Sequence, residues 1–213
     1  LVIIDCQRGG PSTGLPTKTE QSDLNQAIFG GHGEAPRVVM APSNVKDCFF
    51  GIIKAFNIAE KYQIPVIFLS DQSLSQRTQT YTRPKLSAIE VWNRVVATAE
   101  GGDYLRYKLT DNGVSPTAIP GKSPKSYVAT GLEHNENGDP NYTPANHFRM
   151  MQKRHKKLEY IAKEKGFTRR FGDDHAKVGI LSWGSTEGPI EEAIRKANKS
   201  GYEVAALQVK MLH

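Results

Sequence analysis

The sequence predicts an α/β fold with mainly parallel sheets. Short apolar runs that suit buried strands alternate with segments of helical periodicity that carry capping residues, which is the order of β–α–β units. Two such units stand on either side of a long middle region rich in glycine, proline and polar residues. Because a helical crossover joins strands that run in the same direction, each unit predicts a parallel sheet.

The first unit begins at the first residue of the chain. Its apolar runs predict strands at residues 1–6, 37–41 and 64–70. Ser22 or Asp23 is a suitable cap for a short helix that ends at Gly30, and Asn44 is a suitable cap for a long amphipathic helix to about Gln63. Both β–α–β connections are therefore supported by a helix start signal as well as by hydrophobic pattern.

The second unit lies at the other end of the chain. Strands are predicted at residues 177–183 and 203–212, joined by a helix that Ser185 or Thr186 caps and Gly201 ends. The glycine-bounded turn at 184–188 suits either an anion at the helix start or an ordinary capping turn. Residues 71–144 show weak periodicity, with only 87–98 suggesting a helix or strand, and a stretch this long is typical of a functional or interface loop.

The net charge of +6 is concentrated in one segment. Residues 149–170 hold nine Lys or Arg and two Glu, which leaves 19 basic against 20 acidic residues elsewhere. This segment predicts a helix over 148–166 that ends at Gly166. Its apolar face consists of Met151, Leu158, Ile161 and Ala162. Its basic face suits either solvent or an acidic partner. Without an aromatic platform or zinc-finger spacing, nucleic acid is not a predicted partner.

Composition places the chain among soluble proteins of a reducing compartment, which predicts the cytoplasm. No apolar run is long enough to span a membrane, so no membrane association is predicted. Cys6 and Cys48 are too few for a disulfide framework or an iron–sulfur cluster. Cys6 suits a buried small hydrophobic residue better than a reactive thiol. The polar cluster at 133–139 matches no metal-ligand spacing, and residues 135–138 read as an exposed turn.

The loop that follows the first strand has the strongest functional signal. It combines Arg8 with glycines at 9, 10 and 14 and with the hydroxyls of Ser12, Thr13 and Thr17. Arginine offers a planar fork for a carboxylate or phosphate, and glycines let backbone N–H groups approach a ligand. Open α/β sheets bind ligands at the carboxyl ends of their strands. The same residues also suit a tight surface loop with an exposed arginine.

Six motifs in order along the chain resemble one enzyme family. They are QRGGPSTGLPT from residue 7, GGHGEAPRVVMAPSN from 30, IPVIFLSDQSLSQR from 64, DNGVSPTAIPG from 111, GLEHNENGDP from 131 and WGSTEGPIEEA from 183. Together they resemble the alpha subunit of 2-oxoacid:ferredoxin oxidoreductases, most closely the 2-oxoglutarate type (2-oxoglutarate synthase). The match spans nearly all of the 213 residues, which makes it far more specific than one glycine motif.

The resemblance implies a fold and a reaction. Residues 1–80 are expected to be the C-terminal half of a thiamine-diphosphate pyrimidine-binding domain, 81–144 a connecting or interface region, and 145–213 part of a transketolase C-terminal-like domain. The implied reaction is oxidative decarboxylation of a 2-oxoacid, with the acyl group passed to coenzyme A and the electrons to ferredoxin. The beta subunit is expected to hold Mg²⁺ with the diphosphate, and a [4Fe-4S] cluster.

The resemblance also assigns site residues. Arg8 matches the arginine that pairs with the substrate carboxylate, with the rest of that pocket expected from Gly9, Gly10, Ser12 and Thr13. His32 is a further candidate for substrate binding, because a loop histidine can donate to a carboxylate, although a lone loop histidine is more often structural. Glu34 and Asp71 are candidates for cofactor binding, and Asp71 also suits a helix cap.

The chain is expected to be an internal fragment that is inactive alone. Leu1 opens inside a predicted strand, and the glutamate that activates the cofactor in this family lies upstream of the matching region, so no catalytic residue is assigned. The chemistry of the Arg8 loop leaves two other classes open. One is a carboxylate- or phosphate-binding α/β module without redox activity, and the other is a non-catalytic assembly domain.

Overall fold

The computed structural model describes residues 1–97, 104–122 and 126–213 of the chain. These residues form two compact units. Unit 1 comprises Leu1–Phe56, Pro65–Glu90 and Lys165–His213, and unit 2 comprises Asn57–Ile64 and Val91–Glu164. The three-part division at residues 80 and 144 stays a prediction.

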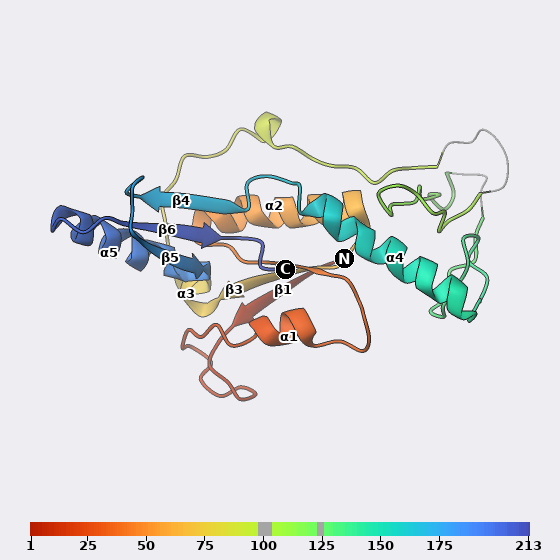
Figure 1. The fold of residues 1–213 in the computed structure, drawn as a ribbon, viewed down its shortest axis with the longest axis horizontal. Coiled ribbons are helices and arrows are strands. Elements are labelled where there is room, and N and C mark those ends of the chain that lie inside the picture. The colour runs from red at the N-terminus through yellow and green to blue at the C-terminus, as the bar shows by residue number, and fades with distance from the viewer. Residues whose placement is uncertain (98–103, 123–125) are drawn as a thin grey trace. The chain divides into compact units, whose positions relative to one another are not determined.

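Unit 1 contains a first sheet of three parallel strands, β1 (Val2–Gln7), β2 (Val38–Met40) and β3 (Val66–Asp71) (Figure 1). Their order is β1-β3-β2, so Val66 of the central strand lies opposite both Val2 and Val38. The strands β2 and β3 are almost wholly buried, whereas the edge strand β1 leaves Ile3 and Ile4 exposed. The predicted strands and their parallel pairing are confirmed.

The helices α1 (Leu24–Phe29) and α2 (Val45–Tyr62) connect the strands of this sheet, and α3 (Gln72–Gln76) follows β3. Asn44 begins α2 as predicted, because its Oδ1 accepts a hydrogen bond from the backbone N–H of Asp47 at 2.9 Å. The buried side chains of Ala27, Val39 and Leu69 pack together with Trp183 from the C-terminal part of unit 1. Residues from both ends of the sequence therefore share one hydrophobic core.

The second sheet of unit 1 contains β4 (Thr168–Gly172), β5 (Val178–Trp183) and β6 (Val204–Val209) in the order β4-β6-β5. The strands β5 and β6 are parallel and joined by α5 (Glu187–Lys199), as predicted. The strand β4 was not predicted, and it pairs antiparallel with β6. Its sequence TRRFG is mostly exposed, so it lacks the alternation of apolar and polar residues that would have revealed a strand. An α/β fold with mainly parallel sheets is confirmed.

The C-terminal segment joins the two sheets of unit 1. Residues 210–213 run antiparallel to β2, with a bridge between Met40 and Met211. The N–H of Leu212 donates to the carbonyl of Val39 at 2.7 Å, and the N–H of Val39 donates to the carbonyl of His213 at 2.8 Å. The outer edge of β2 is thereby paired, which leaves β1 as the open edge of the first sheet.

Unit 2 is built around α4 (Pro144–Ile161). The predicted end of this helix at Gly166 is wrong, because the helix stops at Ile161 and β4 follows in unit 1. The predicted face is only partly right: Ile161 is buried, but Ala162 is exposed, and the buried positions on the same face are Asn146 and Met150. The helix also buries lysine stems, which a pattern of apolar residues cannot reveal.

Turns rather than regular elements make up most of the rest of unit 2. The N–H groups of Tyr107 and Leu109 donate to the carbonyl and the carboxylate of Glu136 at 2.8 Å each. The predicted turn at 135–138 is confirmed, with the N–H of Gly138 donating to the Asn135 carbonyl, although Gly138 itself is buried. In the predicted segment 87–98, a 3₁₀ turn occurs at Leu86–Ala88, and position 98 lies outside the described residues.

Within the described ranges, no helix is both long enough and apolar enough to cross a membrane.

Candidate functional site

The Arg8 loop leaves the carboxyl end of β1, beside the end of β3, where Gln7 lies opposite Asp71. The loop closes on itself, because the N–H of Gly9 donates to the Lys18 carbonyl at 2.9 Å and the N–H of Leu15 donates to the Gly9 carbonyl at 2.8 Å. Its position at the carboxyl end of a parallel sheet is the one predicted, and it is where open α/β folds bind ligands.

Gly14 is the position at which this loop requires glycine. Its φ is +37°, and a Cβ there would lie 2.6 Å from the carbonyl carbon and oxygen of Gly10. Gly10 is different, since the nearest atom to its own added Cβ would be 4.0 Å away. The loop therefore turns back tightly at Gly14 and leaves the Gly10 side open.

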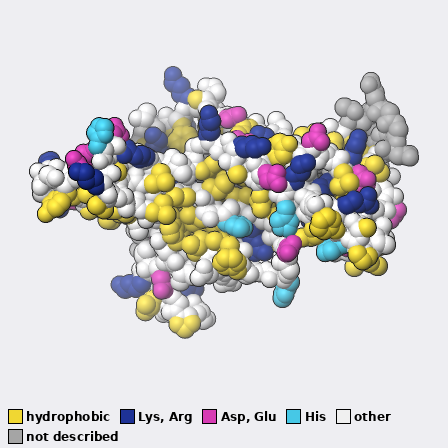
Figure 2. Space-filling view, viewed as in Figure 1, with side chains coloured by type: hydrophobic (Ala, Val, Ile, Leu, Met, Phe, Trp, Pro, Cys, Tyr) yellow, Lys and Arg dark blue, Asp and Glu magenta, His cyan; other side chains and the backbone are white. Residues whose placement is uncertain are grey.

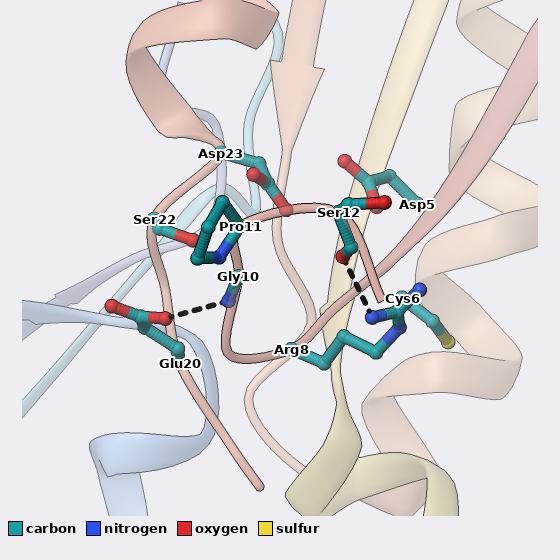
Figure 3. A pocket seen from close by; sticks show the side chains of 9 residues that line it. All are labelled: Asp5, Cys6, Arg8, Gly10, Pro11, Ser12, Glu20, Ser22 and Asp23. Atoms are coloured by element: carbon teal, nitrogen blue, oxygen red, sulfur yellow. Dashed lines mark hydrogen bonds between the residues drawn. The ribbon is translucent and has the colours of Figure 1, made fainter. Parts of the chain in front are cut away.

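Arg8 is fixed by the loop that follows it. Its Nη1 donates to the carbonyl oxygens of Ser12 at 3.0 Å and Thr13 at 2.5 Å. Figure 3 shows the guanidinium curled toward Ser12. In the described part of the chain, Nε and Nη2 have no hydrogen-bond partner. The loop thus orients the guanidinium with one nitrogen and leaves the edge formed by the other two for a planar acceptor such as a carboxylate.

Arg8 opens onto a pocket of about 660 Å³. Three carboxylates line the pocket together with the single guanidinium, so its own charge is negative. The full lining is Asp5, Cys6, Arg8, Gly10, Pro11, Ser12, Glu20, Ser22 and Asp23 (Figure 3). Sequence reasoning found Arg8, Gly10 and Ser12 but missed the carboxylates, because only the closure of the loop brings residues 20–23 back beside β1.

The carboxylates of the pocket are held in different ways. The Glu20 Oε2 accepts a hydrogen bond from the Gly10 N–H at 3.3 Å. The N–H of Asp23 donates to Oε1 of the buried Gln7, whose Nε2 donates to the Ser70 carbonyl. Burial and then the nearby charge of Asp23 raise the pKa of Asp5 above its usual value. The amides of Gly9 and Gly10 are thus already bonded inside the chain, and the ligand roles of both glycines and of Thr13 stay predictions.

Cys6 was expected to be buried, and that expectation is wrong. Its side chain is exposed and lines the pocket, with Sγ 2.9 Å from the Ser75 hydroxyl. The physical reason is its position near the carboxyl end of the edge strand β1, where its side chain opens onto the pocket.

Asp71 caps α3, which confirms its expected role as a helix cap. It is 1% exposed, and its Oδ1 accepts a hydrogen bond from the N–H of Leu74 at 3.0 Å. Gly184 lies beside it: the φ of Gly184 is +66°, and a Cβ there would lie 2.2 Å from Gln21 Nε2 and 3.8 Å from Asp71 Oδ2. The proposed contact of Asp71 with a cofactor stays a prediction.

The turn that begins at Gly184 leads into an ion pair between a buried carboxylate and an exposed arginine. Glu187 is 3% exposed, Arg169 donates to its Oε1, and Asn44 Nδ2 donates to its Oε2 at 2.8 Å. Burial raises the pKa of Glu187, but hydrogen bonds from Ser43, Asn44 and Arg169 outweigh it and leave the pKa below its usual value. The Thr186 hydroxyl donates back to the Trp183 carbonyl and does not cap α5. These bonds favour a structural role for the 184–188 turn.

His32 and Glu34 lie apart from the Arg8 pocket. Both are exposed in the loop that precedes β2, at the amino end of the parallel sheet, whereas Arg8 follows the carboxyl end of β1. Neither lines the pocket. The sequence interpretation grouped them with Arg8 because it did not distinguish the two ends of the strands, and their roles stay predictions.

The polar cluster at 133–139 in unit 2 is engaged in ion pairs. Arg154 Nη2 lies 2.5 Å from Glu133 Oε1, and His147 Nδ1 lies 2.5 Å from Oε2 of the same carboxylate. Arg154 first, and then His147, lower the pKa of Glu133 to about 2, against the opposite effect of its burial. Within residues 1–97, 104–122 and 126–213, no group of three or more His, Cys, Asp or Glu side chains is placed to hold a metal ion.

Comparison with known proteins places this geometry in a family. The family described as pyruvate flavodoxin/ferredoxin oxidoreductase, thiamine diP-bdg matches residues 1–153. Subunit alpha of 2-oxoacid:ferredoxin oxidoreductase 1 from Sulfurisphaera tokodaii is 39% identical and covers 99% of this chain and 34% of its own length. The 2-oxoglutarate oxidoreductase subunit KorA of Mycobacterium tuberculosis is 38% identical over 100% of this chain and 33% of its own.

A solved structure agrees with these relatives. It is 2-oxoglutarate:ferredoxin oxidoreductase from Magnetococcus marinus, with 2-oxoglutarate, coenzyme A and succinyl-CoA bound. The TM-score is 0.95 at 47% sequence identity, over 99% of this chain and 37% of that one. The chain spans about a third of the length of these relatives. The resemblance seen in the motifs is confirmed, and the chain belongs to the thiamine-diphosphate-binding family of pyruvate flavodoxin/ferredoxin oxidoreductases.

Proposed function

We propose that this chain is part of the alpha subunit of a 2-oxoacid:ferredoxin oxidoreductase, and that its Arg8 loop holds the substrate carboxylate. The substrate is 2-oxoglutarate, which is oxidatively decarboxylated to succinyl-CoA while the electron pair passes to ferredoxin. The observation that supports this most strongly is the free edge of the Arg8 guanidinium, which opens onto a pocket at the carboxyl end of a parallel sheet. The 2-oxoglutarate oxidoreductases among its relatives favour 2-oxoglutarate over pyruvate.

Arg8 acts by orientation in this proposal. Release of CO₂ requires the breaking C–C bond to stand perpendicular to the cofactor ring, so that the electrons left behind can delocalise into that ring. A carboxylate held by two parallel N–H bonds from Nε and Nη2 cannot rotate freely. The Ser12 and Thr13 carbonyls keep the guanidinium itself in place, so the loop fixes the donor before the substrate arrives.

The residues of the pocket also fit the cofactor that the family implies. Thiamine diphosphate, when bound, would supply a positively charged ring that accepts the electron pair left behind when CO₂ departs. The carboxylates of Asp5, Asp23 and Glu20 suit a positive ring beside an anionic substrate. Burial, and then the charge of Asp23, raises the pKa of Asp5, and a positive ring would relieve that repulsion. We assign Asp5 and Asp23 to the cofactor side of the pocket and Arg8 to the substrate side.

The remaining parts of the reaction come from outside this chain. A beta subunit completes the assembly, holding Mg²⁺ with the diphosphate and a [4Fe-4S] cluster that passes electrons to ferredoxin. Coenzyme A is the second substrate, and the enzyme works in the cytoplasm. The assignments of partner, cofactors and second substrate rest on the resemblance of the whole chain to alpha subunits that are about three times as long, and the location rests on the low cysteine content.

The test is reduction of a viologen dye by the complete alpha subunit assembled with its beta subunit. We expect reduction that requires both 2-oxoglutarate and coenzyme A, with pyruvate measured in parallel. Reduction with pyruvate alone would keep the family and overturn the substrate. An assembly that carries cofactor and cluster but reduces no dye with any 2-oxoacid would favour a binding module or an assembly domain instead.

A further inference from the structure

A second pocket, of about 460 Å³, lies in unit 2 along α4. One wall is a flank of that helix, where Arg149, Gln152, Lys153 and Lys156 recur at intervals of three and four residues. The other wall is formed by Leu109 and Thr110. Lys and Arg side chains gather along α4 in the space-filling view (Figure 2). We call this pocket the α4 groove.

The cations of the α4 groove are not neutralised by the chain. Within the described ranges, Arg149, Lys153 and Lys156 form no ion pair or hydrogen bond, and one carboxylate, that of Glu159, lines the groove with them. Arg154, on the next flank of the same helix, is different, because it makes two hydrogen bonds to Glu133. The groove therefore has an excess of positive charge that the protein leaves available.

Lys153 is held in this position against an electrostatic cost. Burial first, and then the charges of Arg106 and Arg154, lower its pKa to about 8, with only Glu136 acting in the opposite direction. Lys157, one turn along, has a pKa lowered to about 7 by burial and by Lys153, Arg106 and Arg154. A bound anion would remove this repulsion, because it would compensate several of these cations at once.

The wall opposite the helix is rigidly built. Gly113 has a φ of +73°, and a Cβ there would lie 2.3 Å from the Lys153 carbonyl oxygen, so the turn after Thr110 packs directly against the backbone of α4. The Thr110 hydroxyl donates within this turn to the Val114 carbonyl at 3.1 Å. The width of the groove is thus set by the fold before any ligand binds.

From this geometry we propose that the α4 groove binds the phosphate groups of a small phosphorylated molecule. Arg149 and Lys156 are seven residues apart, which is about 10 Å along a helix, with Lys153 between them. A diphosphate matches that row of three cations better than a single carboxylate does, and arginine and lysine together are the usual phosphate ligands. Leu109 and the His155 ring, which also line the groove, provide an apolar surface for the remainder of the molecule. This inference does not rest on the proposed function.

The experiment is calorimetric titration of the complete, assembled protein with pyrophosphate. We expect saturable binding that Lys153→Met weakens at least tenfold. The matched control is Lys163→Gln, which removes the same charge from an exposed residue of unit 2 outside the groove. Absence of saturable binding, or equal weakening by both variants, would overturn the proposal. ADP in a parallel titration distinguishes a nucleotide from a free diphosphate. Tighter binding of ADP than of pyrophosphate would show that the remainder of the molecule also contacts the groove, at Leu109 and His155.

A pH series provides a second readout. The groups that face Lys153 are Arg106, Arg154, Lys157 and Glu136. Pyrophosphate binding to the protein should weaken between pH 7 and pH 9 relative to Lys153→Arg, because arginine keeps its charge over that range. Identical pH profiles for the two proteins would contradict a direct contact with Lys153. Tighter binding of a polyglutamate peptide than of pyrophosphate would overturn the proposal in favour of an acidic protein partner.

Discussion

Arg8 in unit 1 and the cations of the α4 groove in unit 2 lie in opposite electrostatic surroundings. Arg8 in unit 1 is held by the carbonyl oxygens of its own loop and faces a pocket lined by carboxylates. The cations of the α4 groove in unit 2 face one another, and burial lowers the pKa of Lys153. The first arrangement fixes the orientation of the Arg8 guanidinium at little electrostatic cost. The second concentrates positive charge, which lowers the stability of the folded protein. We infer that Arg8 acts through its orientation and the groove through its charge.

The largest effect on stability is expected in unit 2, beside the α4 groove, at the pair Glu133–Arg154. Replacing Glu133 with Gln makes Arg154 another uncompensated cation, and we expect a loss of about 2–4 kcal/mol in the free energy of unfolding. Thermal unfolding at neutral pH measures it. The control is Glu159→Gln on the same helix, a carboxylate without an ion pair among the described residues, and an equal loss there would contradict the account.

The same pair predicts an acid transition. The pKa of Glu133 is lowered from 4.5 to about 2, so the pair stabilises the fold fully above about pH 4.5 and stops doing so as the pH falls through about 2. The difference in unfolding free energy between the protein and Glu133→Gln should shrink over that window. A difference that stays constant from pH 6 to pH 2 would show that the ion pair with Arg154 does not lower the pKa of Glu133.

Substitution of Gly14 in the Arg8 loop should destabilise the fold, whereas substitution of Gly10 in the same loop should be tolerated. Gly14→Ala places a Cβ 2.6 Å from the Gly10 carbonyl at a positive φ, so we expect a loss of about 1–3 kcal/mol. Gly10→Ala meets no atom closer than 4.0 Å, and its effect on stability should be much smaller. Chemical denaturation compares the two variants, and equal losses would mean that the loop is not held in this closed conformation.

Lys157→Met is expected to stabilise unit 2. The pKa of Lys157 is lowered from 10.5 to about 7, so the charged form is disfavoured in the folded protein, and stability should rise with pH between about 7 and 10.5. The variant lacks this charge but also loses the hydrogen bond to the Gln63 carbonyl. We expect a net gain of about 1–2 kcal/mol at pH 7 that disappears above pH 10.5. A variant that is less stable at both pH values would contradict the repulsion in this cluster.

The smallest effect is expected at Asp5. Because its pKa is raised, ionisation of Asp5 costs stability above that pKa and costs nothing in acid, below the ordinary value of 3.8. Asp5→Asn should therefore stabilise the fold at pH 7 by less than about 1 kcal/mol, since solvent screens this half-exposed group. Melting temperatures at pH 7 and pH 3 test it, and a variant that is destabilised at pH 7 would show that the charged form is preferred.

The sequence predicted most of unit 1 and little of unit 2. The strands β1, β2, β3, β5 and β6 carry apolar runs, and α2 has both a cap at Asn44 and an amphipathic pattern, so local signals were sufficient. The strand β4 has no such pattern. The buried faces of Lys153 and Lys157 could not be predicted, because hydrophobic periodicity assigns lysine to the surface whatever its stem contacts.

The sequence predicted the part of the candidate site that lies in the Arg8 loop but not the carboxylates that complete the pocket. Arg8 stands out because an arginine among glycines follows a strand. Glu20 and Asp23 reach the pocket only because the loop closes between Gly9 and Lys18, a backbone contact that leaves no trace in residue type. His32 was placed on the wrong end of the sheet for the same reason, since its position depends on strand direction rather than on its neighbours in sequence.

The most direct test of the central claim is kcat/KM for 2-oxoglutarate in the assembled enzyme carrying Arg8→Lys. Lysine keeps the charge but cannot make two parallel hydrogen bonds, so we predict a fall of about 30-fold or more with thermal stability and cofactor content retained. Arg170→Lys is the matched control, because Arg170 also donates to a loop carbonyl in unit 1 but lies outside the Arg8 pocket, and its kcat/KM should stay within about twofold. A value for Arg8→Lys within about twofold of the unmodified enzyme would show that Arg8 does not hold the substrate carboxylate.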